Sequence, residues 1–500
     1  MIVTWITGVY NLVYILISNS LRRYYTRKLL KLTKHIKIDK NLKVILLVTV
    51  KDDFLPNNLL FTLKQTYKFS EIYILDDSIT IEFKKMIDDF GKKHNCNVVR
   101  RNTNELYKVG NLNNWLKINN KPYDYIVNID ADELLPPNFV EDNLKIFYVA
   151  GNENIGMVQS TQSSYKQDTF FANAIRYSLD SGSCNTIVDN KIGIDRWFGH
   201  GSIISKKCLE KMNFKYTDIM NDMYGVNYEI LSAGYKIFIS NLAPTGNFIQ
   251  TDSITFRRAQ IRNLYLFVEY AESKFIKILF SKKISFQYKC LLSFVICTKM
   301  FTYFSIFCNL IINAILFGLN YHQNTIYIFT IISILFSITQ LLNYVLTLLF
   351  RIGLWKFIIF IAIYSLTWSA IFYQNIEAVF MKVILRKNPW FRVTPKYSRR
   401  ITLWQNLFHN RRELISMTIM MSIAISLYFT VITDKSSIQG FLSFLHIPNF
   451  ITPFLTIVIT QVCGVAITAT TNIRMKNDVI ELKIDLVHNY KKMKNQMNLS

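Results

Sequence analysis

The sequence contains few cysteines, and none of them stands in a pattern that would bind a metal or build a disulfide framework. There are 7 cysteines in 500 residues, with no Cys-x-x-Cys pair and no zinc-ligand spacing. Their number is odd, which favours reduced structural thiols over a set of disulfides. The sequence also lacks internal repeats and low-complexity tracts. A zinc module, a disulfide scaffold and a repeat protein are therefore not predicted.

Acidic residues are scarce. There are 34 Asp and Glu against 58 Lys and Arg, which gives a formal net charge of +24. Such an excess suits either nucleic acid or an anionic membrane face. The basic residues cluster beside apolar segments, at 22–34, 282–283, 396–400 and 411–412. This juxtamembrane placement favours a protein of the lipid bilayer and predicts no nucleic acid partner.

Apolar residues are abundant but unevenly distributed. They make up 51% of the chain, and they gather in residues 2–18 and again after residue 290. The basic stretch follows the first apolar run, whereas in a signal peptide it would precede that run. Residues 1–20 are therefore predicted to be a retained transmembrane anchor, and residues 40–285 a cytoplasmic domain of ordinary globular composition.

The second half of the chain predicts a multi-pass membrane protein. Residues 286–384 are assigned to interfacial and transmembrane helices, 385–412 to a cytoplasmic loop, 413–475 to a transmembrane helix pair and 476–500 to a cytoplasmic tail. The expected spans after the anchor are 300–319, 326–350, 414–432 and 451–471. Residues 357–376 are apolar enough to span as well, but a span there would place the basic residues 382–412 outside. A helix over 357–384 that lies in the interface or packs within the protein is favoured; six spans are the alternative.

The region 40–285 carries the pattern of an α/β domain. Short β-branched runs at 43–50, 72–75, 97–99 and 125–129 predict strands buried on both faces of a parallel sheet. Helical patterns at 55–66 and 80–94 lie between them. This alternation predicts a mostly parallel, doubly wound sheet with helices on both faces. Ligands of such sheets bind beyond the carboxyl ends of the strands, where Asp76-Asp77 and Asp130-Ala-Asp132 are expected.

Two local motifs suggest a site for a phosphorylated ligand. In an extended segment residues i and i+2 point to one side, so Asp130 and Asp132 could jointly hold Mg²⁺ or Mn²⁺, with phosphate oxygens and water as further ligands. In Lys108-Val-Gly-Asn-Leu-Asn-Asn114, Gly110 permits close backbone approach and Lys108 could pair with a phosphate. A turn or surface pair of aspartates and a helix start with a surface lysine are the alternatives.

Taken together, the motifs resemble those of the family 2 glycosyltransferases, in particular the membrane branch that includes cellulose, hyaluronan and other polysaccharide synthases. The matching segments occur in the family's order: Asp76-Asp77-Ser78, Lys108 to Asn113, Asp130-Ala-Asp132, Val158 to Gln162, Phe198 to Ser205, and Asn221-Asp222 ahead of Ala233 to Lys236. Phe391-Arg-Val-Thr-Pro-Lys396 resembles the gating loop of the synthase branch. Such a loop must be cytoplasmic, in agreement with the favoured topology.

The resemblance implies a nucleotide-sugar-binding domain of GT-A-like fold joined to a transmembrane region. It also implies a role for each matching residue. Asp76 and Asp77 would contact uridine, Lys108 would lie near the phosphates, and Asp130 and Asp132 would hold the metal ion, Asp132 most directly. Asp222 would be the general base that deprotonates the acceptor hydroxyl and so inverts the anomeric centre. Thr394 and Lys396 would contact the diphosphate when the loop closes.

Two departures from the family pattern concern the acceptor. The base motif is Met220-Asn221-Asp222, with Asp218 as a nearby competitor for the role. The synthases' Gln-x-x-Arg-Trp appears as Gln260-Ile-Arg262-Asn263 after Ala259. Arg262 could still bind diphosphate, but the tryptophan that stacks on the acceptor is replaced by Asn263. Trp197 could supply stacking area instead, although a core position suits it better.

The leading hypothesis is a hexosyltransferase of the polysaccharide synthase type. It would transfer a hexose from a UDP-sugar to a growing β-linked polysaccharide, with Mg²⁺ or Mn²⁺, and move the polymer across the cell membrane. The alternative is a non-processive transferase that adds one sugar to a lipid or glycolipid acceptor. A transporter with an inactive cytoplasmic module is disfavoured, because the predicted spans hold almost no charged residues.

Overall fold

A computed structural model describes residues 2–164, 169–179, 189–192, 196–296, 344–386 and 401–411, together with a few further single positions. Its centre is a seven-stranded sheet with the order β3-β2-β1-β4-β6-β5-β7. The strands are β1 (Val44–Val50), β2 (Glu71–Asp76), β3 (Asn97–Val99), β4 (Tyr125–Asp130), β5 (Ile155–Ser164), β6 (Ser202–Ser205) and β7 (Lys236–Asn247). The four predicted strands correspond to β1 to β4, so this part of the sequence prediction is confirmed.

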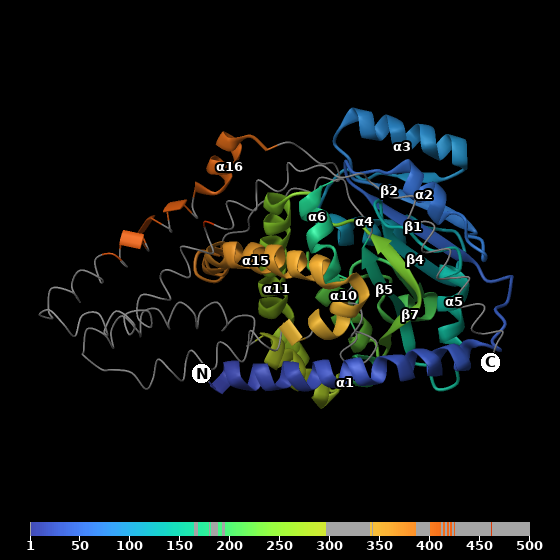
Figure 1. Cartoon of the computed structure of the whole chain (residues 1–500). Coiled ribbons are helices and arrows are strands. Elements are labelled where there is room, and N and C mark those ends of the chain that lie inside the picture. The colour runs from blue at the N-terminus through green and yellow to red at the C-terminus, as the bar shows by residue number, and fades with distance from the viewer. Residues whose placement is uncertain are drawn as a thin grey trace, which may run out of the picture.

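Helices cover both faces of the sheet, as Figure 1 shows. One face packs against α2 (Pro56–Thr62), α3 (Ile81–His94) and α5 (Phe139–Phe147), and the other against α4 (Tyr107–Ile118), α9 (Lys206–Lys211) and α10 (Asp222–Ser232). The central strand β1 serves both layers, because alternate side chains of a strand point to opposite faces. Val44, Leu46 and Val48 lie in the first core, and Ile45 and Leu47 in the second. This is why its apolar run is continuous rather than alternating.

The sheet is mostly parallel, as the sequence predicted, but one strand runs against the others. Strands β1, β2, β3 and β4 pair in parallel, and β5 pairs in parallel with β7. The short strand β6 lies between them and is antiparallel to both β4 and β5. The turn that precedes β6, residues 198–201, is therefore delivered to the same edge as the carboxyl ends of β1, β2 and β4.

Long helices flank the sheet domain. The helix α1 (Ile2–Thr33) runs along its base (Figure 1) and contacts α5 and β7. Leu29 of α1 is buried there, and Thr26 Oγ1 accepts a hydrogen bond from Asn241 Nδ2 at 2.6 Å. The helix α11 (Ser253–Phe280) packs against α15 (Leu354–Val383), and α15 also contacts α6 (Phe170–Ile175). The remaining helices of the described residues are α8 (Asp189–Ile192), the π-helix η2 (Val345–Leu349), α14 (Phe350–Ile352) and α16 (Leu403–His409).

In the part of the chain that the structure describes, no helix has both the length and the apolar character needed to cross a bilayer. The predicted spans 300–319, 326–350, 414–432 and 451–471 lie wholly or largely outside the described residues, as do the motif 391–396 and the tail 476–500.

Candidate functional site

A cavity of about 380 Å³ opens at the carboxyl edge of the sheet. Its walls come from the ends of β1, β2 and β4, the start of α4, the turn 198–200, the start of α10 and the middle of α11. Parallel strands present their carboxyl ends at one edge, and the start of α4 follows directly from that edge. Helices α10 and α11 arrive from much later in the sequence and form the opposite wall.

Five of the residues that the sequence predicted for the site line this cavity: Asp77, Lys108, Asp130, Asp222 and Arg262. Two further predicted residues, Asp76 and Asp132, are buried and are not among the lining residues. Thr394 and Lys396 lie outside the described residues. The structure therefore brings together acidic and basic groups from five separate motifs.

Asp76, the last residue of β2, and Asp77, the residue after it, are each held by an arginine. Arg100 Nε donates to Asp76 Oδ2 at 2.7 Å. Arg101 forms a bidentate pair with Asp77, from Nε to Oδ1 at 2.8 Å and from Nη2 to Oδ2 at 2.7 Å. The side chains of Asp77 and Arg101 are only 6% and 8% exposed. Both carboxylates are thus held in place by a positively charged partner. A nucleobase that contacts Asp77 would therefore also contact Arg101.

The lysine and the aspartate on the neighbouring wall form a second fixed pair. Lys108 Nζ donates to Asp130 Oδ1, which also accepts from Thr49 Oγ1 at 2.9 Å. Burial alone would lower the pKa of Lys108, but Asp130 and Asp222 outweigh it, so the pKa lies above its usual value. Lys108 is therefore a cation at the cavity wall at neutral pH, placed to meet an anionic ligand.

The two aspartates predicted to hold a metal ion do not stand in one extended segment. Strand β4 ends at Asp130, and the chain turns at 131–132, where Glu133 N donates to Asp130 O at 3.1 Å. Asp130 lines the cavity, whereas Asp132 is 7% exposed and does not. No group of three or more His, Cys, Asp and Glu that could hold a metal ion occurs among the described residues. The chain's residues fit a divalent cation at Asp130 that takes most of its ligands from a diphosphate and water.

Asp222 stands at the first turn of α10. Asn221 caps this helix, because its Oδ1 accepts from Tyr224 N at 2.9 Å. Asp222 Oδ1 accepts from Met223 N at 2.9 Å, and a Cβ on Gly199, where φ is +94°, would lie 3.0 Å from Asp222 Oδ2. Glycine at that position thus leaves room for the carboxylate over the cavity.

Asp218, the alternative candidate for the base, pairs with a lysine that does not line the cavity. Asp218 Oδ1 accepts from Lys274 Nζ at 2.6 Å, and Asp218 is not among the cavity residues. Burial would raise the pKa of Asp218, but the Lys274 ammonium outweighs it and the pKa lies below its usual value. Of these two aspartates, Asp222 is the one among the described residues that lines the cavity.

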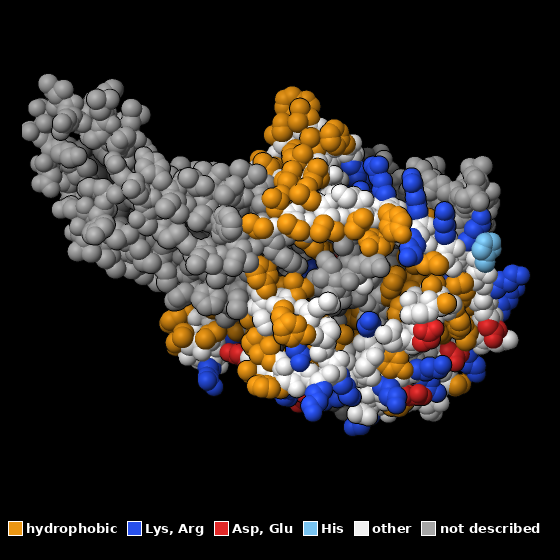
Figure 2. All heavy atoms as spheres, turned by 90° about the horizontal axis from the view of Figure 1, so that it is seen from below, with side chains coloured by type: hydrophobic (Ala, Val, Ile, Leu, Met, Phe, Trp, Pro, Cys, Tyr) orange, Lys and Arg blue, Asp and Glu red, His pale blue; other side chains and the backbone are white. Residues whose placement is uncertain are grey.

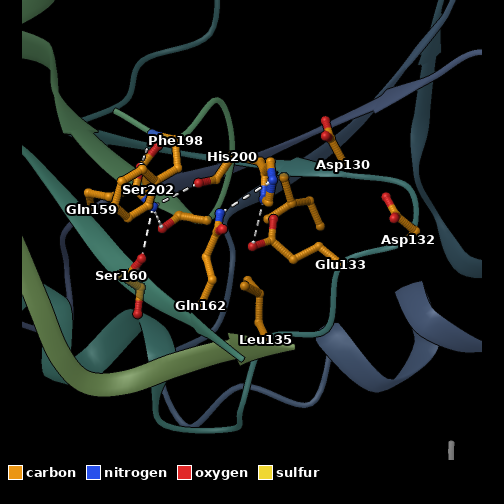
Figure 3. Close-up of polar contacts among 12 residues, drawn as sticks. Asp130, Asp132, Glu133, Leu135, Gln159, Ser160, Gln162, Phe198, His200 and Ser202 are labelled. Carbon is orange, nitrogen blue, oxygen red and sulfur yellow. Dashed lines mark hydrogen bonds and ion pairs between the residues drawn. The ribbon is translucent and has the colours of Figure 1, made fainter. Parts of the chain in front are cut away.

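The turn 198–201 is held in place by hydrogen bonds from Gln159, which is fully buried on β5. Its Oε1 accepts from Phe198 N at 2.9 Å, and its Nε2 donates to His200 O at 2.9 Å and to Gly201 O at 3.1 Å (Figure 3). One side chain thus satisfies three backbone groups of the turn. The motif Val158 to Gln162, to which the sequence assigned no role, supplies the support that holds this turn in place.

His200 projects from that turn toward Glu133 and Asp130 (Figure 3). Its Nδ1 lies 3.1 Å from Glu133 Oε1, and Glu133 is 1% exposed. The contact is an ion pair rather than a well-aligned hydrogen bond. Burial would lower the pKa of His200, but Glu133 and Asp130 raise it to about 9. At neutral pH the imidazole is therefore protonated and adds a second cation beside Asp130.

Arg262 and Asn263 of α11 complete the far wall. Burial lowers the pKa of Arg262, although Asp222 and Asp130 act in the opposite direction; an arginine remains charged in proteins. Trp197 is fully buried, stacks on Tyr216 with centroids 5.9 Å apart, and donates from Nε1 to Ser202 Oγ at 2.8 Å. It is a core residue and does not replace the missing stacking tryptophan at Asn263.

Sequence reasoning missed Arg100 and Arg101, although a signal for them exists. Leu75 of β2 pairs with Val99 of β3 in parallel register. Continuing that register by one and two residues places Asp76 beside Arg100 and Asp77 beside Arg101. Two acidic residues after one strand and two basic residues after the next thus predict ion pairs once the strands are known to be neighbours.

Comparison with known protein families gives one match. Residues 44–209 match the model of the family described as Glycosyl transferase family 2. The matched residues include strands β1 to β6 of the sheet. Asp222 and Arg262 lie beyond the matched residues, on the helices that close the cavity. No curated protein matches the chain.

Several solved structures resemble the chain at low identity. The mannosyltransferase PcManGT from Pyrobaculum calidifontis, in complex with GDP-Man and Mn²⁺, is 14% identical with a TM-score of 0.47, over 77% of this chain and 100% of that one. TarS 1-349 of S. aureus in complex with UDP is 12% identical with a TM-score of 0.34, over 51% and 72%. GalNAc-T7 with UDP, GalNAc and Mn²⁺ is 13% identical with a TM-score of 0.33, over 47% and 48%. These similarities are too distant to indicate a substrate.

Proposed function

We propose that the chain is an inverting glycosyltransferase that uses a UDP-sugar as donor. The observation that carries the proposal is the position of Asp222, which faces the cavity together with Lys108, Asp130 and Arg262. A carboxylate there can take the proton of an acceptor hydroxyl as that oxygen attacks the anomeric carbon. The bond from this carbon to the diphosphate breaks, and UDP leaves with the electron pair. Single displacement inverts the anomeric centre, so an α-linked donor gives a β-linked product.

The basic groups of the cavity suit the departing diphosphate. Lys108 and Arg262 lie on opposite walls, and both are close enough to Asp130 and Asp222 for those carboxylates to shift their pKa values. A Mg²⁺ or Mn²⁺ ion held by Asp130 would offset the negative charge that builds on the leaving group. Lys108 donates to Asp130, and we expect the lysine to exchange this partner for a phosphate oxygen when the donor binds.

We propose further that the enzyme works at the inner face of the cell membrane, with its catalytic domain cytoplasmic. On α1 the residues Val9, Val13, Leu16 and Ile17 are exposed, and the basic residues 22–34 follow them. The face seen in Figure 2 shows apolar side chains gathered at its upper centre, with lysines and arginines beside and below them. Five described aromatic side chains on the flanking helices and loops are also between 78% and 92% exposed, namely Phe280, Phe286, Phe350, Trp355 and Trp404. Apolar surface of this extent beside basic residues is typical of contact with a bilayer.

The acceptor proposed first is a growing β-linked polysaccharide that the enzyme extends with hexose units and moves across the membrane. The apolar segments beyond residue 290 support it, since one anchor would suffice for membrane location. Asn263 favours the second candidate, transfer of a single sugar to a lipid or glycolipid acceptor. It lines the cavity where the synthases carry a tryptophan, and an amide offers less area for stacking on a chain of sugars.

The test is an assay of the full chain purified in detergent, supplied with a panel of UDP-sugars and Mn²⁺. We expect release of UDP with one or a few sugars, and loss of turnover when excess EDTA is added. Product size separates the two acceptors, because extension gives polymer and single transfer gives a one-sugar adduct. Failure to bind UDP or to release it from any UDP-sugar would exclude the proposed reaction, and full activity in EDTA would exclude the metal ion.

A further inference from the structure

The helix α11 contains a carboxylate close to the cavity that the proposed chemistry does not use. Arg262, Asn263 and Leu266 of this helix line the cavity. Glu269 follows one turn later, is half-buried, and is not among the described lining residues. The helix packs against α10, which begins at Asp222. The surroundings of Glu269 therefore show what the carboxylate does beside the proposed base.

The carboxylate of Glu269 lies at the backbone of the two residues that precede Asp222. Burial raises the pKa of Glu269 above its usual value, while the backbone amide of Met220, the ammonium of Lys382 and the backbone amide of Asn221 act in the opposite direction. Its Oε2 is buried and has no hydrogen-bond partner among the described residues. Because an incompletely paired buried carboxylate costs stability, its position is better explained by what it holds than by a gain for the fold.

The side chain of Asn221 ties the same segment to α11. Its Nδ2 donates to Leu266 O at 2.7 Å, and its Oδ1 accepts from Tyr224 N at 2.9 Å. Asn221 is 4% exposed. One buried amide therefore caps α10 and joins it to α11, directly before Asp222 in the chain.

Apolar contacts hold both ends of the segment 219–224 against the same helix. A core cluster includes two aromatic residues of α11, Phe267 and Tyr270. From the segment it includes Ile219 and Tyr224. The ring of Tyr224 is stacked on that of Tyr270 with centroids 5.1 Å apart, and it meets the ring of Phe267 edge to face at 5.2 Å. The segment is thus fixed at its ends by packing, and between its ends by polar contacts.

We propose that Glu269 is a positioning residue for the base, which holds the backbone before Asp222 so that this carboxylate stays over the cavity. The inference rests on the proposed function, since it names how the base of that reaction is kept in place. Displacement of a reacting group by about 1 Å can lower a rate about 100-fold. The donor groups of the strand side do not depend on this contact. Loss of Glu269 should therefore lower turnover and leave donor affinity unchanged.

Steady-state kinetics and UDP titration of the full chain in detergent test the proposal, with Mn²⁺ and the UDP-sugar of the panel that releases UDP fastest. We expect Glu269→Ala to lower kcat roughly 10- to 100-fold, and to leave the donor KM and the UDP affinity within about twofold. Glu269→Gln keeps an oxygen that can accept from the backbone, and kcat should return to within about fivefold of the parent. Glu272→Ala is the matched control, because this exposed glutamate lies on the same helix away from the cavity; kcat should be retained.

A double variant separates positioning from direct action. The residual rate of Asp222→Asn comes from a site without its base, so the addition of Glu269→Ala should lower that rate by less than about twofold. Glu269→Asp is a second probe that leaves less empty space than alanine and keeps the charge. It shortens the side chain by one methylene, so kcat should fall in the same direction as in Glu269→Ala.

The outcomes distinguish this inference from the proposed function. If the parent releases UDP from no UDP-sugar, the proposed function is wrong, and the inference with it. If the parent is active and both Glu269→Ala and Glu269→Asp keep its kcat, only the inference is overturned. An equal fall in rate on adding Glu269→Ala to the parent and to Asp222→Asn would also overturn it, because Glu269 would then act independently of the base. A loss of UDP affinity as large as the loss of kcat would overturn it too, since general loss of structure would explain both.

Discussion

The two sides of the cavity differ in whether their charged groups form ion pairs. On the strand side, formed by Asp77, Lys108 and Asp130, charged groups pair with one another or with Arg101. On the helix side, formed by Asp222, Arg262 and Asn263, neither Asp222 nor Arg262 forms an ion pair with another described residue. Paired groups hold fixed positions, whereas a carboxylate without a cationic partner stays available to accept a proton.

This difference suits the two tasks proposed for the site. Recognition of a nucleotide gains from groups whose places are set before the ligand binds, since less ordering is then lost on binding. Proton transfer needs a base that lies near other charged groups but forms no ion pair with them. The strand side is therefore expected to contribute to stability and donor affinity, and the helix side to turnover.

The largest expected effect concerns the helix side. Asp222→Asn keeps the shape of the side chain and removes the base, so kcat should fall about 10³-fold while UDP affinity stays within a factor of about two. Steady-state kinetics and UDP titration measure the two quantities. Asp218→Asn is the matched control and should retain kcat. A loss of kcat in Asp218→Asn with activity kept in Asp222→Asn would reverse the assignment of the base.

The next largest effect compares how much the strand side and the helix side of the cavity contribute to the stability of the fold. Asp77→Ala removes the partner of Arg101, whose side chain is 8% exposed, and leaves a buried guanidinium without its carboxylate. The free energy of unfolding should fall by about 3 kcal/mol. Asp222→Ala breaks no ion pair and should cost less than about 1 kcal/mol.

Denaturant unfolding of the detergent-solubilised chain gives both values. In the double variant Asp77→Ala/Arg101→Leu much of the loss should be recovered, because the unpaired charge is gone. Equal destabilisation by Asp77→Ala and Asp222→Ala would show that the two sides do not differ in the way their charges are held.

The smallest expected effect concerns His200, which lies near Glu133 and Asp130. Its pKa is raised to about 9 from 6.5, chiefly because Glu133 and Asp130 outweigh the effect of burial. Protonation therefore stabilises the folded state. This contribution is complete below pH 6.5 and is lost as pH rises through 9; it amounts to roughly 2–3 kcal/mol. The thermal midpoint of the parent should fall between pH 6.5 and 9.5 by more than that of His200→Gln. Parallel pH dependences in the two proteins would mean that the ion pair with Glu133 contributes nothing.

The sequence alone determined the frame of the domain. The runs at 43–50, 72–75, 97–99 and 125–129 became β1 to β4 because a strand buried on both faces needs continuous β-branched residues, and that pattern is local. The sequence also predicted that Asp77, Lys108 and Asp130 lie at the carboxyl edge of the sheet, because parallel strands end at the same edge. Residues 44–209, which match the family model, contain all four of these strands.

Tertiary structure decided which side chains meet. The turn after Asp130 moved Asp132 away from the cavity lining, the packing of α10 and α11 brought Asp222 and Arg262 to the opposite wall, and the register of β2 and β3 paired Asp77 with Arg101. Ion pairs between distant segments depend on how helices and strands pack against one another. The periodicity that predicts strands and helices depends on residues that are neighbours in the sequence. These contacts, in contrast, form only when distant segments of the chain have packed together.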